Sequence, residues 1–159
     1  MKSVIPILSC LLAVAIILSC NVGELEAGVV TNYEIDTNCA QDIIVYELRI
    51  TDCTEMPCTI RRGKRYTIEG DIGVLRNVTN PMLKCSSVYL GRHIDLPGHG
   101  GCPNLTNGTC PMVVGERYTT ATSFKLPYYV PPMLYTAYCS MVDDEGENLI
   151  CGWGSGRVT

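Results

Sequence analysis

Ten cysteines in a chain of 159 residues are the feature that most limits how this sequence can fold. At this density they indicate either a disulfide framework formed in an oxidising compartment or a metal-binding scaffold. A zinc scaffold is expected to show paired C-x2-C knuckles. The sequence contains none, because its close pairs are Cys53/Cys58 and Cys102/Cys110. We therefore expect disulfides, no metal and no other cofactor.

The N-terminal segment is typical of a secretory signal peptide. A short basic start, Met1-Lys2-Ser3, precedes an almost wholly apolar run from Val4 to Leu18. This run suits the apolar region of a signal peptide but is short for a bilayer-spanning helix of about 20 residues. An uncleaved membrane anchor is the alternative. We predict a signal peptide over residues 1–22, ending somewhere from residue 20 to residue 28, and one domain over residues 29–159.

Removal of a signal peptide leaves eight cysteines, an even number that is typical of four disulfides in an exported chain. We therefore expect a secreted protein, either extracellular or in the endosomal or lysosomal lumen. Acidic residues outnumber basic ones by 16 to 12, for a net charge of −4. Proteins that bind nucleic acid neutralise phosphates with a basic face, so we expect no nucleic-acid partner.

Apolar residues recur at every second position in several segments, which predicts β-strands rather than helices. The first such segment runs from Ile44 to Ile50, with Ile44, Tyr46, Leu48 and Ile50 expected on one face. Further strands are expected over residues 66–72, 118–126, 133–142 and 149–153, with turns at 61–64 and 143–146. No internal repeat is apparent. About seven short strands predict an all-β, immunoglobulin-like two-sheet β-sandwich.

The cysteines, strands and turns follow each other in a recognisable order. Cys39 precedes Cys53-Thr-Glu-Met-Pro-Cys58, then Arg62-Gly63 and Tyr66-Thr67-Ile68. Further on come Cys102, Cys110, Tyr118, Leu126-Pro127, Asp143-Asp144 with Gly146, and Cys151. Over residues 33–153 this order resembles the ML (lipid-recognition) domain family, which includes the Niemann-Pick type C secreted sterol-transfer protein and the mite group-two allergens.

The resemblance implies three disulfides: Cys39–Cys151, Cys53–Cys58 and Cys102–Cys110. In the loop-entropy model, the first of them stabilises the fold by about 4–5 kcal/mol. Cys85 and Cys139 depart from the six-cysteine pattern. Both fall in predicted strands, so we expect a fourth bridge, Cys85–Cys139, and two buried free thiols are the alternative. The Gly152–Gly156 tail also departs from the pattern, because family members continue a β-strand there.

The resemblance further implies that the two sheets splay apart around an internal apolar cavity. The implied function is to carry a sterol or another small hydrophobic, fatty acid-like lipid without chemical turnover. The protein would act as a monomer and pass the lipid to a membrane or receptor. A receptor-interacting protein that presents microbial lipid in innate immunity is the alternative. The positions that match the family's cavity wall are Ile50, Tyr66, Ile68, Val88, Leu90, Leu96, Leu126, Pro127, Val130, Met133, Tyr135 and Ala137. At each of them, ordinary core packing is the alternative.

Two polar motifs indicate surface features. His93 and His99 flank Asp95 in a stretch that matches no metal signature. We expect exposed loop histidines there, and sensing of endosomal pH by them is the alternative. The basic cluster Arg61–Arg65 predicts a solvated turn, with a patch for anionic lipid headgroups or a partner as the alternative.

Neither a catalytic nor a nucleotide-binding motif is present in the sequence. It contains no G-x-S-x-G elbow, no P-loop and no dinucleotide-binding fingerprint, so we expect no enzyme. Three N-glycosylation sequons predict surface loops of a secreted protein. They begin at Asn77, Asn104 and Asn107.

Overall fold

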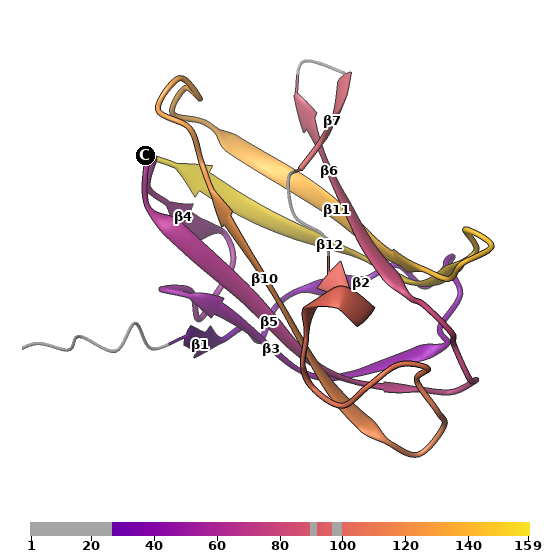
Figure 1. The fold of residues 1–159 in the computed structure, drawn as a ribbon. Helices are drawn as coiled ribbons and strands as arrows, with labels where there is room; N and C mark the ends of the chain where they lie inside the picture. Colours follow the sequence, from indigo (N-terminus) through magenta and orange to yellow (C-terminus); the bar gives the residue numbers. More distant parts are fainter. Residues whose placement is uncertain (1–26, 90–91, 97–99) are drawn as a thin grey trace, which may run out of the picture.

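The computed structural model describes residues 27–89, 92–96 and 100–159, and Figure 1 shows their arrangement. The expected signal peptide lies outside these residues. The elements of the described chain are β1 Ala27–Val29, β2 Glu34–Ile35, β3 Ile43–Thr51, β4 Cys58–Ile60, β5 Arg65–Val74, β6 Met82–Tyr89, β7 Arg92–Asp95, β8 Gly100–Gly101, a 3-10 turn Cys102–Asn104, β9 Leu105–Asn107, β10 Arg117–Lys125, β11 Leu134–Val142 and β12 Asn148–Val158. β1 begins two residues before the expected start of the domain.

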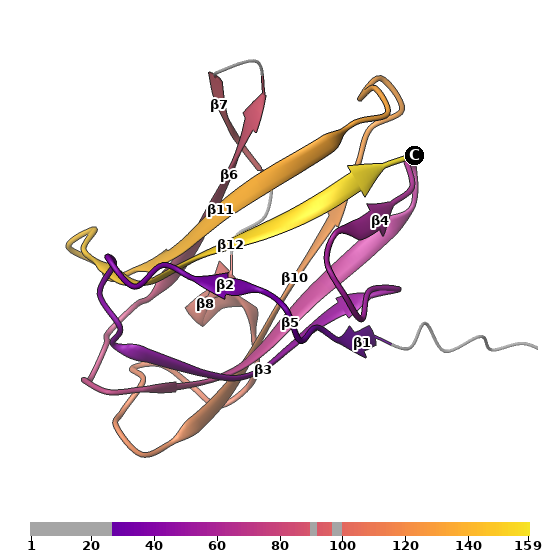
Figure 2. The ribbon, with the colours of Figure 1, turned by 180° about the vertical axis from the view of Figure 1, so that it is seen from behind.

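The strands form two sheets that face each other, as Figures 1 and 2 show from opposite sides. Sheet A has the strand order β1-β3-β5-β10-β9. Sheet B has the order β2-β12-β11-β6-β7, with β4 added parallel to β12 and β8 added to β6. The predicted all-β, immunoglobulin-like two-sheet sandwich is confirmed.

The five long strands predicted from alternation are present, but the count of about seven strands was too low. One additional strand, β6, has eight residues. The others have two to four residues each, which is too short to show an alternating pattern. His93 belongs to β7 and not to a loop. The expected departure at Gly152–Gly156 was also wrong, because β12 continues through this segment to Val158 and pairs with β11 as far as Arg157.

Two clusters of buried residues fill opposite ends of the sandwich. The Tyr118 cluster comprises Ile43, Ile72, Val74, Val78, Met112, Tyr118, Met141 and Leu149. The Tyr66 cluster comprises Val30, Ile50, Cys53, Cys58, Ile60 and Tyr66. Each tyrosine is the second residue of its strand, and β5 and β10 run antiparallel, with Tyr118 opposite Ile72 and Phe124 opposite Tyr66. The tyrosines therefore define a Tyr118 end and a Tyr66 end.

Four disulfides join the described cysteines in the expected pairs. They are Cys39–Cys151, Cys53–Cys58, Cys85–Cys139 and Cys102–Cys110. Cys85 and Cys139 are directly opposite each other on β6 and β11, with a Cα–Cα distance of 4.1 Å. Cys53 follows β3 in sheet A and Cys58 begins β4 in sheet B, so their bridge connects the two sheets at the Tyr66 end.

Candidate functional site

The two sheets enclose a cavity of about 240 Å³. It lies between the two buried clusters, since its wall includes Ile72 and Met141 of the Tyr118 cluster and Ile50 and Ile60 of the Tyr66 cluster. Most of the lining side chains are aliphatic, aromatic or sulfur-containing. The sandwich is thus solidly packed at both ends and hollow between them.

A β-bulge in β3 decides which side chains form the wall of sheet A. The register with β5 shifts between Val45 and Glu47, and one extra residue reverses the direction of every side chain after it. As a result Val45 and Leu48 both line the cavity. The sequence-based assignment of Ile44 and Tyr46 to the same face as Leu48 was wrong, because these two side chains are 39% and 51% exposed.

A row of glycines forms the corresponding part of sheet B. Gly152, Gly154 and Gly156 of β12 are paired with Cys139, Ala137 and Tyr135 of β11, so they share the inner face with these residues. A Cβ atom on Gly154 would lie 3.1 Å from Cε of Met56, and one on Gly156 would lie 2.4 Å from the Tyr135 ring. The absence of side chains on the inner face of this part of β12 therefore leaves room for Met56 and Tyr135.

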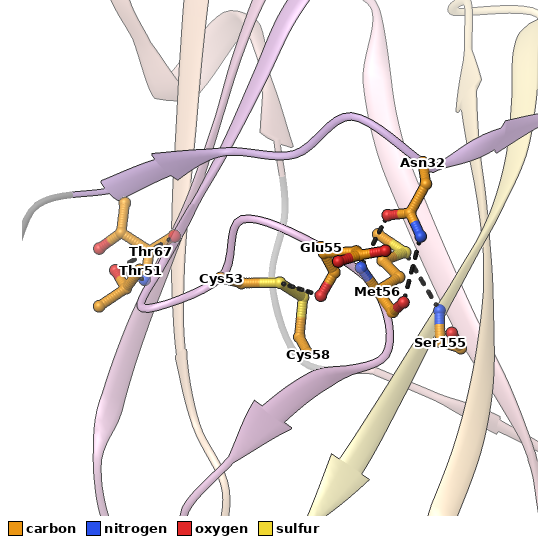
Figure 3. The surroundings of a disulfide bond; sticks show 8 residues. All are labelled: Asn32, Thr51, Cys53, Glu55, Met56, Cys58, Thr67 and Ser155. Atoms are coloured by element: carbon orange, nitrogen blue, oxygen red, sulfur yellow. Dashed lines mark hydrogen bonds between the residues drawn. A yellow bond between two sulfur atoms is a disulfide. The ribbon is translucent and has the colours of Figure 1, made fainter.

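Met56 reaches the cavity from the loop between β3 and β4. The side-chain amide of Asn32 accepts a hydrogen bond from the Met56 backbone N–H (2.7 Å) and donates one to the Met56 carbonyl (3.1 Å), as Figure 3 shows. The Met56 sulfur accepts the backbone N–H of Ser155 at 3.3 Å. The hydrogen bonds of the Met56 backbone to Asn32 and of its sulfur to Ser155 thus fix a flexible side chain in place beside the Cys53–Cys58 disulfide.

The cavity wall reaches the surface at the edge where β2 pairs with β12. Ile35 of β2 is opposite Gly152 on the inner face, belongs to the lining and is 41% exposed. Trp153 lies between Gly152 and Gly154 in β12, so its ring is on the outer face. The Trp153 ring packs on Tyr138 with ring centroids 4.4 Å apart. β2 has only two residues, so it covers this edge of β12 through two paired positions alone.

Few polar groups contact the interior. The hydroxyl of Thr120 accepts the backbone N–H of Gly101 at 3.1 Å. Burial raises the pKa of the Tyr135 phenol, and the nearby Tyr66 raises it further; the phenol is therefore neutral at physiological pH. Within the described residues, no cluster of His, Cys, Asp and Glu could hold a metal ion, and no helix is long and apolar enough to cross a membrane.

The main ion-pair network lies on the outer face of sheet A. Arg49 of β3 contacts Glu69 and Asp71 of β5, and Arg117 of β10 also contacts Asp71. Hydrogen bonds from Arg49 and from the Thr119 hydroxyl hold the pKa of Asp71 below its usual range. These charges stabilise the strand pairing and leave the inner face to apolar groups.

The structure brings four of the twelve expected lining residues to the wall. They are Ile50, Ile68, Tyr135 and Ala137. Tyr66 is fully buried in its own cluster, and Leu126 packs against that cluster. The remaining described positions fall outside the lining: Leu96, Pro127, Val130 and Met133. Leu90 and the side chain of Val88 lie outside the described part of the chain, as does His99.

Sequence reasoning did not single out several wall residues. Met56 and Phe124 lie in segments that it identified, but nothing in their spacing points inward. The glycine row had a visible signal, because three glycines at every second position of a strand remove all side chains from one face. The sequons are at the Tyr118 end, where Asn77 and Asn107 are exposed and Asn104 is partly buried.

Comparisons with known proteins agree on the fold. The sequence profile of the ML domain matches residues 32–154. The mite group 2 allergen Gly d 2.02 of Glycyphagus domesticus is 32% identical over 114 residues, which cover 68% of this chain and 85% of the allergen. Der f 2 of Dermatophagoides farinae is 29% identical over 77 residues, or 47% of this chain and 51% of that allergen.

Two solved structures share the arrangement of strands. A Niemann-Pick type C2 protein from the Japanese carpenter ant superimposes with a TM-score of 0.58 and 16% identity, covering 85% of this chain and 98% of the ant protein. The C-terminal domain of wzt superimposes with a TM-score of 0.54 and 9% identity, covering 84% and 82% of the two chains. At these identities the superpositions show a common fold.

Proposed function

The chain belongs to the ML domain family, whose members bind lipids, and from this premise we propose that it is exported and carries a small hydrophobic lipid between its sheets. The observation that carries the proposal is the apolar cavity between two solidly packed ends. An apolar cavity stays dry and takes up an apolar molecule of matching shape. Uptake replaces a void with contacts, and needs no chemical change in the lipid.

The size of the cavity favours a slender guest. Its volume of about 240 Å³ is just below the roughly 300–1,000 Å³ that is usual for ligand pockets. A single acyl chain can adapt its torsions to such a space, whereas a rigid four-ring sterol requires the sheets to part further. We therefore favour a fatty acid-like lipid over a sterol as the cargo.

The expected affinity suits a carrier that must release its cargo. A ligand of about 20–28 non-hydrogen atoms at about 0.3 kcal/mol per atom binds with about 6–8 kcal/mol, which corresponds to micromolar dissociation constants. The Tyr135 phenol is uncharged, and burial raises its pKa further, so this wall residue carries no charge that an apolar chain would strip of water.

The test is to fill the cavity from one wall. Ala137 lines the cavity at the middle of β11, whereas its neighbour Thr136 is exposed on the other face of the same strand. We expect Ala137→Phe to weaken binding of the fluorescent fatty acid cis-parinaric acid at least about tenfold, and Thr136→Phe to leave it unchanged. Fluorescence titration measures both, and dehydroergosterol in parallel compares a sterol with the acyl chain.

The proposal fails if Ala137→Phe folds with its disulfides intact and still binds the fatty acid like the original chain. Should that variant be unstable, Ile68→Phe fills the cavity from sheet A and provides the same comparison. Tighter binding of dehydroergosterol than of the fatty acid would keep the carrier function and reverse the choice of cargo.

A further inference from the structure

One end of the sandwich is basic, although the whole chain carries a net charge of −4. At the Tyr66 end, the turn before β5 meets the last residues of β10 and the residue after β12, since Arg65 is paired with Lys125 and the backbone N–H of Arg62 donates to the Thr159 carbonyl at 3.3 Å. The basic residues gathered there are Arg61, Arg62, Lys64, Arg65, Lys125 and Arg157. The acidic side chains of the adjoining β3–β4 loop are Asp52 and Glu55.

Most of these basic side chains are available to a partner. Arg61, Arg65, Lys125 and Arg157 are exposed, and within the described residues they form no ion pair. The other two are engaged: Lys64 pairs with Asp52, and the side chain of Arg62 donates to the Thr159 carbonyl at 3.2 Å. Their positions still add positive charge to the same surface.

Exposed aromatic and apolar side chains lie beside these charges. Tyr128 is 75% exposed and Tyr129 is 86% exposed in the loop between β10 and β11, and Leu134 at the start of β11 is 63% exposed. The Tyr128 ring lies directly over Gly63, where a Cβ atom would be 2.2 Å from it. The backbone N–H of Gly63 donates to the Leu126 carbonyl at 2.8 Å. The loop and the basic turn therefore form one continuous surface, the basic aromatic end.

The sequence keeps its sequons away from this surface. Asn77 follows β5, and Asn107 of β9 is opposite Thr119 at the start of β10, so both are at the Tyr118 end. In Figure 1 the C-terminus, β4 and the loop between β10 and β11 lie together at the opposite extremity. Any glycan attached at the sequons would leave the basic aromatic end uncovered.

Resting on the proposed carrier function, we propose that the basic aromatic end docks on the surface of an anionic lipid bilayer. Tyrosines concentrate at the level of lipid headgroups, where the ring is apolar and the hydroxyl remains hydrated. Each basic residue close to an anionic bilayer strengthens binding about fivefold. Two tyrosines, a leucine and four exposed cations together give reversible attachment, which suits a protein that collects and delivers lipid. The exposed cations match phosphate and carboxylate headgroups, and the exposed tyrosine and leucine side chains match the apolar layer beneath them. This combination favours a bilayer over a protein partner.

The experiment measures co-sedimentation of the full disulfide-bonded protein with vesicles. One set contains phosphatidylcholine alone and the other adds about 30% phosphatidylserine. Two variants alter the surface: Arg61→Glu with Arg65→Glu, and Tyr128→Ser with Tyr129→Ser. Matched controls alter exposed residues elsewhere, namely Lys84→Glu on the outer face of sheet B and Leu75→Ser with Val114→Ser at the Tyr118 end.

We expect binding to the phosphatidylserine vesicles that weakens as salt is added, and little binding to phosphatidylcholine alone. The arginine variant should lose at least about 25-fold in vesicle affinity, the tyrosine variant should also bind more weakly, and the controls should bind like the original chain. Equal binding to both vesicle types, equal loss in the controls, or no vesicle binding at all would overturn the proposal, and the last result would favour a protein partner for this surface.

A separate measurement keeps this proposal distinct from the carrier function. The arginine and tyrosine variants should take up cis-parinaric acid like the original chain, because none of the four residues lines the cavity. Conversely, Ala137→Phe should lose uptake and keep its binding to phosphatidylserine vesicles. Vesicle binding that is lost in Ala137→Phe while the fold is intact would show that attachment depends on cargo and would contradict an independent docking surface.

Discussion

The two ends of the sandwich are built on the same short motif, and their difference shows how one backbone device can serve two environments. Arg62-Gly63-Lys64-Arg65-Tyr66-Thr67 and Val114-Gly115-Glu116-Arg117-Tyr118-Thr119 share glycine, arginine, tyrosine and threonine at the same positions. Both glycines have left-handed φ angles, 77° and 89°. In each case the backbone N–H five residues before the tyrosine donates to its hydroxyl at 2.8 Å.

The ends differ at the residue after the glycine. Glu116 accepts the hydroxyl proton of Tyr118 at 2.9 Å, whereas Lys64 pairs with Asp52 and its ammonium lies 5.6 Å from the centre of the Tyr66 ring. Tyr118 is completely buried, and burial raises the pKa of its phenol. The same turn and tyrosine anchor thus accept either charge, and the sign of that charge separates the basic aromatic end from the Tyr118 end.

Removing either tyrosine ring should have the largest effect. Tyr118→Ala and Tyr66→Ala each leave a hole in a closed cluster, and we expect each to lower the free energy of unfolding by about 3–5 kcal/mol. Guanidinium denaturation without reductant measures both values. If only one variant were destabilised, the two tyrosines would not be equivalent anchors.

Removing only the hydroxyl groups should have a smaller effect. Tyr118→Phe and Tyr66→Phe leave a backbone N–H without its acceptor, which costs about 1–3 kcal/mol. We expect the larger loss for Tyr118→Phe, because Glu116 also loses its donor. Tyr138→Phe, on the outer face of sheet B, serves as a control, and denaturation of the three variants should rank them in this order. Equal losses at both ends would mean that the Glu116 contact adds nothing.

Gly63 and Gly115 allow the cost of backbone strain to be compared with the cost of a steric collision. Gly115→Ala places a Cβ atom in open space, so its cost is that of a left-handed alanine, about 1–2 kcal/mol. Gly63→Ala adds a collision with the Tyr128 ring and should destabilise more. In a chain that also carries Tyr128→Ser, Gly63→Ala should destabilise the fold only as much as Gly115→Ala does. If the gap in thermal denaturation persisted, Tyr128 would not be its cause.

Exchanging the charges should have the smallest effect on stability. Lys64→Glu and Glu116→Lys alter partly exposed groups, and such pairs contribute up to about 1 kcal/mol. We expect each single variant to lose less than that, with Lys64→Glu also weakening binding to phosphatidylserine vesicles. A loss in stability as large as that of the tyrosine-to-phenylalanine variants would show that the turn itself depends on its charge.

The comparison also shows where reasoning from the sequence stopped. The long strands other than β6 followed from alternation. The repeat of the turn motif was not recognised, because six residues separated by more than forty do not stand out without their shared geometry. The resemblance assigned Tyr66 to the cavity wall together with Ile68, two positions further along β5. In the structure, its hydroxyl is bound by the Arg61 N–H at the edge of the sheet, and the ring fills the Tyr66 cluster instead.

Period-two patterning was enough to predict two sheets, and the number of cysteines was enough to predict four disulfides, because both are properties of neighbouring or countable residues. The choice between a Cys85–Cys139 bridge and two free thiols, by contrast, depends on the register of β6 against β11. The shape of the hollow depends on the bulge in β3 and on which side chains fill the space beside Gly154 and Gly156. Such features arise from distances between strands that are remote in the chain, so only the folded molecule decides them.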